Sequence, residues 1–157
     1  MARLRSTRHR LRRLADIGRR QRALLIEAAL WLLLARLALA LVPFARLARR
    51  LGTFVPPSDP QVAERRLGGS DEHVRLAEEI SWAVTRAARH VPYRAACLPQ
   101  AMAARMMLKR RRVPSVLHFG AAMDAGHPLD THAWLEAVGV EVTGFPASDF
   151  ADIACFV

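Results

Sequence analysis

Residues 23–42 form one long apolar run, ALLIEAALWLLLARLALALV, in which the only charged residues are Glu27 and Arg36. A helix of about 20 apolar residues is long enough to cross a bilayer. Each internal charge costs roughly 2.5–3.5 kcal/mol at the bilayer centre on insertion scales. The run therefore predicts one long helix with three alternatives: a helix packed on the rest of the chain or on a partner protein, an interfacial membrane anchor, or a single membrane span.

Positive charge is concentrated in the N-terminal third. Residues 1–50 contain 13 arginines and two acidic residues, whereas residues 51–157 contain 11 basic and 12 acidic residues. An arginine-rich segment of this kind suits nucleic acid, anionic lipid or an acidic protein. Nucleic acid fits least, because no aromatic residues alternate with the arginines and no zinc-finger or aromatic RNA-binding motif follows. We expect no nucleic-acid partner.

The cysteine content indicates the compartment. Cys97 and Cys155 are the two cysteines, and two do not make a disulfide framework. A reducing compartment is therefore the default. The apolar run is too long for a secretory signal peptide, and no small-residue cleavage site closes it. We expect a cytoplasmic protein, with membrane association through residues 23–42 as the alternative.

Prolines and glycines divide the first half of the chain. Pro43 interrupts the long helix, and residues 44–51 continue it as a short basic amphipathic helix that ends at Gly52. Residues 53–60 contain three prolines and are typical of a linker. Asp59 and Pro60 then begin a short helix that Gly68 ends.

Two helices are expected in the second half. Ser70 caps the first, which ends before Pro92. Its apolar stripe consists of Val74, Ala77, Ile80, Val84 and Ala87. The second begins at Cys97 and is ended by Pro114. One face of it carries Cys97, Ala101, Ala104 and Leu108, whereas Arg105, Lys109 and Arg112 point away.

Short strands follow these helices. Residues 116–123 read as a strand, and residues 124–130 as a polar loop. Residues 132–137 and 140–143 predict a hairpin around Val138 and Gly139. Residues 153–157 predict a last strand. The expected fold class is α+β, with an apolar helical extension (1–55), a linker with a short helix (56–70) and a domain with a small antiparallel sheet (71–157).

The chemistry centres on Cys97 and His132. The positive end of a helix dipole favours the thiolate of a cysteine at the helix start. A nearby imidazole can hold the proton and later return it to a leaving amine. The backbone N–H of Cys97 and the side chain of Gln100 are candidate donors for the oxyanion. The pair therefore predicts a cysteine nucleophile with His132 as general base and acid.

Other interpretations of the same residues remain open. A cysteine on an apolar helix face is often a small core residue. A zinc site could instead collect Cys97, His118, His127 and His132, but their spacing fits no standard zinc pattern. We therefore expect no metal and no cofactor.

The flanking sequence resembles a known family. Cys97-Leu98-Pro99-Gln100-Ala101, then Pro114-Ser115 before a strand, then His132-Ala133-Trp134-Leu135-Glu136 are similar to the transglutaminase-like leader peptidases of lasso-peptide biosynthesis. The resemblance covers residues 71–157 well. The segment from the apolar run through Pro43-Phe44-Ala45-Arg46 is similar to the helical extension common in that family.

The resemblance implies a papain/transglutaminase-like fold and a cysteine peptidase. Such enzymes remove the leader from a ribosomally made precursor, and a separate ATP-using lasso cyclase then closes the ring. A separate leader-recognition protein binds the leader, and residues 1–55 do not look like such a module. The implied partners are thus the precursor leader, the recognition protein and the cyclase, with a membrane surface as a further candidate through residues 23–42.

The sequence departs from the family at the third catalytic group, an acid near the imidazole. A two-residue turn at Val138-Gly139 places Thr143 and Gly144 near His132, and neither is an acid. Glu141 pairs with Glu136, which is four residues from His132. At ~3.3 Å per residue, Glu141 would lie on the order of 13 Å from the imidazole. Asp149 is our prediction for this role. Asp130, Asp152, a changed register through a β-bulge, and a Cys-His dyad oriented by a backbone carbonyl are the alternatives.

Two rival functions remain at this stage. An acyltransferase on the same fold would pass the acyl group to an amine rather than to water. A non-catalytic scaffold would use the basic helix to hold a membrane or a partner protein.

Overall fold

The protein is described here by a computed structural model covering residues 18–122, 130–144 and 150–157. Asp149 and His127 lie outside these residues. The elements are α2 (Arg19–Leu41), α3 (Phe44–Leu51), β1 (Phe54–Val55), α4 (Pro60–Leu67), α5 (Asp71–Ala88), α6 (Cys97–Arg110), β2 (Val116–Ala122), β3 (Asp130–Ala137), β4 (Val140–Thr143) and β5 (Ala151–Phe156). Helices and a small antiparallel sheet confirm the α+β class.

The predicted capping residues begin two of the helices. The Asp59 carboxylate accepts the backbone N–H of Gln61, which fixes the start of α4. The Ser70 hydroxyl accepts the N–H of His73 at the start of α5. The buried residues of α5 are Ala77, Ile80, Ala83, Val84 and Ala87, so its predicted apolar stripe faces the core.

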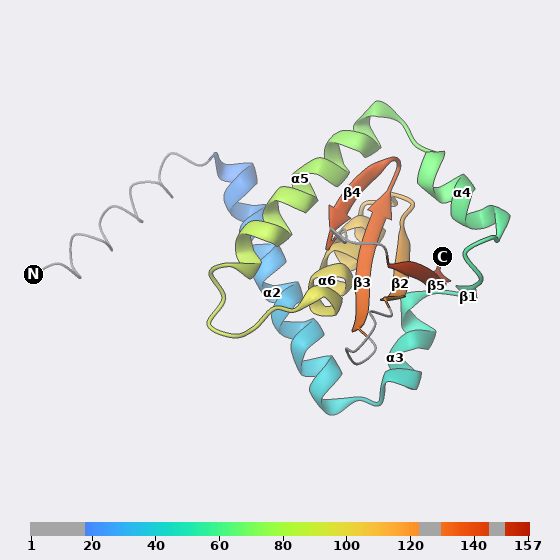
Figure 1. Ribbon diagram of the computed structural model, residues 1–157. Coiled ribbons are helices and arrows are strands. Elements are labelled where there is room, and N and C mark those ends of the chain that lie inside the picture. The colour runs from blue at the N-terminus through green and yellow to red at the C-terminus, as the bar shows by residue number, and fades with distance from the viewer. Residues whose placement is uncertain (1–17, 123–129, 145–149) are drawn as a thin grey trace, which may run out of the picture.

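The five described strands form one sheet in the order β1-β5-β2-β3-β4. Leu117 and Leu135 are paired neighbours on one face, where they join the large core cluster made with α2, α5 and α6. The opposite face carries Val116 and Cys155, which pack with Val62 of α4. Figure 1 shows α2, α5 and α6 to the left of and behind the strands, and α4 to their right. Residues of β2 and β3 therefore alternate between an α6 face and an α4 face.

The predicted hairpin is present, and its register changes within it. Val138 and Gly139 have φ of +47° and +82°, as a two-residue hairpin turn requires. Ala137 pairs with Val140 and Glu136 with Glu141, as predicted, but Leu135 pairs with Thr143. The register shifts by one residue between Leu135 and Glu136, so the pairing extrapolated from the turn does not hold beyond Glu136.

β1 was not predicted. It lies within the proline-rich segment that reads as a linker, and it pairs with β5 through Phe54↔Phe156 and Val55↔Cys155. The Thr53 and Val157 backbones also exchange two hydrogen bonds of 3.0 Å. The chain therefore crosses from the helices to the sheet edge and is hydrogen-bonded there.

Arg105 does not point away from the core, contrary to the sequence prediction. Its side chain is buried, and its guanidinium donates to the carbonyl oxygens of Ser115 (3.2 Å) and Phe156 (2.9 Å). Burial lowers the pKa of Arg105 to about 10. This arginine links α6 to the start of β2 and the end of β5, because carbonyls at those points need donors.

The long helix α2 packs along the domain and is only partly covered. Leu24, Ala28, Leu32 and Ala35 are buried against α5 and α6. The outward side exposes six large apolar residues: Ile26, Leu30, Leu33, Leu34, Leu37 and Leu41. The helix is long and apolar enough to cross a membrane by length and composition. One face is therefore bound to protein, and the other is apolar and uncovered.

Glu27 anchors this helix to the domain. Its carboxylate accepts hydrogen bonds of 2.6 and 3.1 Å from the guanidinium of Arg111, just beyond α6, and Arg110 lies 3.4 Å away. The hydrogen bonds from Arg111 hold the pKa of Glu27 below its usual value. The charge that interrupts the apolar run thus serves an intramolecular ion pair.

We expect Glu27→Gln to lower the free energy of unfolding by about 1 kcal/mol at neutral pH, since a two-bond Arg–carboxylate pair is lost at a partly exposed site. Because the folded pKa of Glu27 is lowered, its stabilisation is present above the unfolded pKa and is lost as pH falls through the folded value. The free energies of unfolding of the variant and the wild type, measured with urea, should therefore converge at acid pH.

Glu78→Gln, at an exposed position of α5, is the control and should change little. A difference between Glu27→Gln and wild type that stays constant down to acid pH would contradict the role of this ion pair.

Candidate functional site

Cys97 is the first residue of α6, as predicted. The cap residue Ala96 offers no side-chain hydrogen bond, and the first turn carries no acidic residue that would oppose a thiolate. The cysteine is free and half-buried. Its thiol has no hydrogen-bond partner among the described residues. The sulfur thus lies at the positive end of the α6 dipole.

Gln100 is partly engaged elsewhere. Its side-chain amide donates to the carbonyl oxygen of Ala95 at 2.7 Å, before the helix begins. One of its two N–H groups is therefore used to hold the chain entering α6. Only the other remains for the oxyanion role that the sequence suggests.

His132 lies near the start of β3 and is held by a backbone carbonyl. Its Nε2 is in a short hydrogen bond with the carbonyl oxygen of Gly144, just after β4. A carbonyl can only accept, so Nε2 carries the proton of this bond. No hydrogen bond engages Nδ1 among the described residues. The neutral ring thus presents the Nδ1 lone pair for accepting a proton.

Gly144 is suited to this position by its lack of a side chain. Its φ is +67°, and a Cβ there would lie 2.8 Å from the carbonyl oxygen of Ala133 and 3.5 Å from His132 Nε2. Any other residue would be strained and would press on the strand that carries the imidazole. The glycine therefore allows the chain after β4 to approach β3 closely.

The imidazole also rests on aromatic rings. The ring centroid of His132 lies 6.3 Å from that of Trp134 and 5.4 Å from that of Phe150. Trp134 is buried, and it stacks on His118 at 5.2 Å with an interplanar angle of 5°. Trp134 therefore packs on this face of the sheet between the two imidazoles.

Cys97 and His132 lie toward the same end of the sheet but on different faces of β3. β2 begins next to the end of α6 and runs back along it, and the start of β3 pairs with the end of β2. His132 shares the α4 face with Trp134, whereas α6 packs on the other face. No hydrogen bond joins the Cys97 thiol to the His132 ring among the described residues.

None of the three candidate acids is seen beside His132. Asp149 lies outside the described residues, as does the side chain of Asp130. Asp152 instead contacts His118, with its Oδ2 2.6 Å from His118 Nδ1. Among the described residues, the Gly144 carbonyl occupies the orienting position, which was one of the alternatives left open by the sequence.

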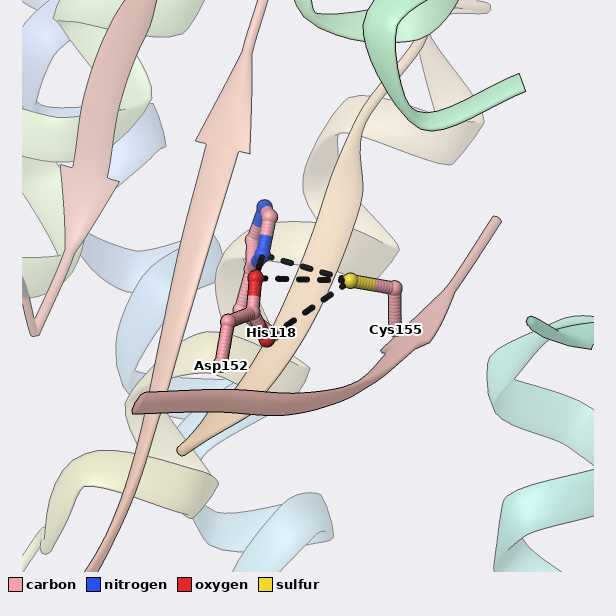
Figure 2. Close-up of side chains that lie close together, drawn as sticks. All are labelled: His118, Asp152 and Cys155. Carbon is pink, nitrogen blue, oxygen red and sulfur yellow. Dashed lines mark hydrogen bonds and ion pairs between the residues drawn. The ribbon is translucent and has the colours of Figure 1, made fainter. Parts of the chain in front are cut away.

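A second cluster lies on the α4 face: His118, Asp152 and Cys155 (Figure 2). The Cys155 sulfur is 3.4 Å from His118 Nδ1 and 3.6 and 3.7 Å from the two Asp152 oxygens. Burial, followed by the charge of Asp152, raises the pKa of Cys155 to about 12. The sulfur is therefore a protonated, fully buried thiol.

This cluster does not have the geometry of a catalytic triad. In a cysteine triad one imidazole nitrogen faces the thiol and the other faces the acid. Here Cys155 and Asp152 both contact Nδ1 of His118. Nε2 instead lies 3.7 Å from Glu136 Oε2 and has no hydrogen-bond partner. Sequence reasoning missed the cluster, although it placed His118 on a strand.

Glu136 has a structural role. It is buried on the α4 face and forms an ion pair with the guanidinium of Arg66 at the end of α4. The pair ties α4 to β3.

The protein-family comparison agrees with this architecture. The family described as the Transglutaminase-like superfamily matches residues 38–155, most of the chain. The chain therefore belongs to the transglutaminase-like superfamily. This superfamily includes cysteine peptidases and acyltransferases, and its members usually act through a cysteine. Comparisons with curated proteins and with solved structures gave no match.

We expect the neutral His132 ring to carry its proton on Nε2, because the Gly144 carbonyl needs a donor. Gly144→Ala should weaken this preference, since the added Cβ displaces the carbonyl. ¹⁵N NMR of the imidazole nitrogens distinguishes the two tautomers.

Gly139→Ala is the matched control, with φ of +82° and open space around the added Cβ. It carries a similar backbone cost, on the order of 1–2 kcal/mol, but leaves His132 untouched. If the two variants show the same tautomer as wild type, the Gly144 contact does not set it.

Proposed function

We propose that this protein is a cysteine peptidase that removes the leader from a ribosomally made lasso-peptide precursor. Membership of the transglutaminase-like superfamily supports cysteine-based acyl chemistry. The match to the leader-peptidase sequence pattern around Cys97 and His132 supports the choice of substrate. The observation that carries the catalytic assignment is the His132 ring, anchored through Nε2 and with no partner on Nδ1 among the described residues.

In the proposed reaction, the Cys97 thiol gives its proton to His132 Nδ1 and attacks the carbonyl carbon of the leader–core bond. The backbone N–H of Cys97 donates to the oxyanion. The intermediate collapses, the C–N bond breaks, and the imidazolium protonates the departing amine of the core. His132 then takes a proton from water, which hydrolyses the thioester and releases the leader.

The reaction requires the imidazole to reach the thiol around the end of β3. Both groups lie toward this end of the sheet, on opposite faces of the strand. Among the described residues, neither the Cys97 thiol nor Nδ1 of the anchored ring has a competing hydrogen bond.

We propose three partners: the precursor leader, a separate leader-recognition protein and the lasso cyclase that acts on the released core. The described part of the N-terminal extension consists of α2 and α3, which pack on the domain, and β1, which pairs with β5. It therefore supplies no separate surface of the strand-helix kind to hold a leader, which supports a recognition protein in trans.

Incubation of the full chain with the precursor and its recognition protein should give the free leader and core, detected by mass spectrometry. Cys97→Ala should abolish this cleavage. His132→Ala should reduce the rate by about 10²–10⁴, the usual contribution of a general base. His90→Ala, at an exposed position just after α5 where the ring contacts the carbonyl oxygen of Arg86, is the matched control and should be fully active.

Addition of a primary amine separates peptidase from acyltransferase. Release of leader with a free carboxyl group at high amine concentration supports hydrolysis, whereas quantitative leader–amine adduct supports transfer. Cleavage by Cys97→Ala at the wild-type rate would overturn the proposal.

We further propose that α2 places the enzyme on an anionic membrane surface. Its uncovered face presents Ile26, Leu30, Leu33, Leu34, Leu37 and Leu41. The arginine-rich segment next to it has the charge that anionic headgroups attract. The buried opposite face and the Glu27 ion pair favour a helix lying on the surface over one that spans it.

The full chain should cosediment with vesicles that contain anionic lipid, and less with neutral vesicles. Leu30→Ser with Leu37→Ser should remove roughly 2 kcal/mol of apolar transfer energy, or more than tenfold in binding. Leu67→Ser is the control, because Leu67 is even more exposed but lies on α4. Equal binding of the double variant and wild type would contradict a surface role for α2.

A further inference from the structure

We propose that His118, Asp152 and Cys155 form a binding site for a divalent metal ion of the zinc type. This site is separate from Cys97 and His132, and the inference does not depend on the proposed peptidase activity. One imidazole nitrogen, one carboxylate and one sulfur converge here, with the ligand atoms all within 4.8 Å of one another (Figure 2). Nitrogen, oxygen and sulfur donors together suit zinc.

The spacing of the ligand atoms is close to that of a tetrahedral site. Zinc bonds of about 2.0 Å to nitrogen and oxygen and 2.3 Å to sulfur place tetrahedral neighbours roughly 3.3–3.5 Å apart. The sulfur lies 3.4 Å from His118 Nδ1 and 3.6 Å from Asp152 Oδ2. Only the Nδ1–Oδ2 separation, 2.6 Å, is that of a hydrogen bond and must open.

A β-bulge brings the two β5 ligands to one face. His118 pairs with Cys155 and Gly120 pairs with Asp152, so three steps along β5 match two along β2. Ile153 is therefore the extra residue. Without it, Asp152 and Cys155, three apart, would point to opposite faces. The bulge thus serves to gather these side chains, as bulges beside functional sites often do.

The far side of the imidazole supports the same conclusion. His118 is 2% exposed, and its Nε2 is a buried atom with no hydrogen-bond partner. Glu136 Oε2 lies 3.7 Å from Nε2 and is held in place by Arg66. When a metal occupies Nδ1, the ring proton moves to Nε2 and points at this carboxylate. A carboxylate behind a metal-bound histidine is a common way to orient such a ligand.

The charges at the site balance when a divalent ion is bound. Metal binding replaces the Cys155 thiol proton, which leaves to solvent, so that sulfur, Asp152 and Glu136 supply three negative charges. Arg66 and the ion supply three positive charges. The Asp152 side chain is 27% exposed, so an ion can reach the site from its side and water can fill a fourth position.

Cobalt(II) tests the site on the full-length chain, because it replaces zinc and gives visible spectra. Cys97→Ala leaves Cys155 as the only thiol, so any sulfur-to-cobalt charge-transfer band in this variant must come from Cys155. After chelation and dialysis, we expect one Co²⁺ per chain, intense tetrahedral d–d bands, a charge-transfer band and release of about one proton per ion.

Two further variants define the ligands. Cys155→Ser should abolish the charge-transfer band, and Glu136→Gln should keep the band but weaken cobalt binding by roughly 10–100-fold. Circular dichroism checks that each variant is folded, and the Cys97→Ala spectrum decides the outcome if Cys155→Ser does not fold. Sub-stoichiometric cobalt at micromolar concentration, or octahedral spectra without sulfur character, would overturn the proposal and leave a buried hydrogen-bonded cluster.

Discussion

The unbroken antiparallel pairing of β2 with β3 is the constraint on which the rest of the structure depends. From Val116↔Glu136 to Ala122↔Asp130 the register does not change. Successive side chains of both strands therefore alternate between the α6 face and the α4 face. This alternation builds the apolar core around Leu117 and Leu135, and it gathers His118, His132, Trp134 and Glu136 on the opposite side.

The irregular features lie on β4 and β5, the strands that flank this regular pair, and they change which groups contact its side chains. The shift in the β3–β4 pairing and the positive φ of Gly144 bring a backbone carbonyl to His132. The bulge at Ile153 brings Asp152 onto the α4 face, where it contacts His118. Two imidazoles on one face thus have different partners: one is oriented by a carbonyl, and the other is surrounded by a thiol and carboxylates.

Much of the fold is encoded in local patterns. Asp59 and Ser70 marked helix starts, and Val138-Gly139 marked the hairpin, because capping and turn chemistry act over a few residues. Arg105 was misplaced because helical periodicity assigns a charge to solvent, whereas chain-end carbonyls distant in sequence need its donors. β1 was missed because a strand of two residues next to prolines is too short to show the alternation of polar and apolar residues that predicts a strand.

The candidate site was predictable only in part. The positions of Cys97 at a helix start and of His132 on a strand follow from the sequence. The cluster around Cys155 depends on a β-bulge, which no residue type in β5 predicts. Glu27, which interrupts the apolar run, was read as a cost for membrane insertion. Its pairing with Arg111 is a long-range contact, 84 positions apart in sequence, which helical periodicity cannot reveal.

The central claim is that His132 activates the Cys97 thiol, and alkylation of the native chain tests it most directly. With iodoacetamide at neutral pH and peptide mapping, Cys97 should be labelled much faster than the buried Cys155. His132→Ala should slow the Cys97 reaction by about tenfold or more, whereas His90→Ala should not. Equal labelling of both thiols, or a Cys97 rate unchanged by His132→Ala, would contradict the account.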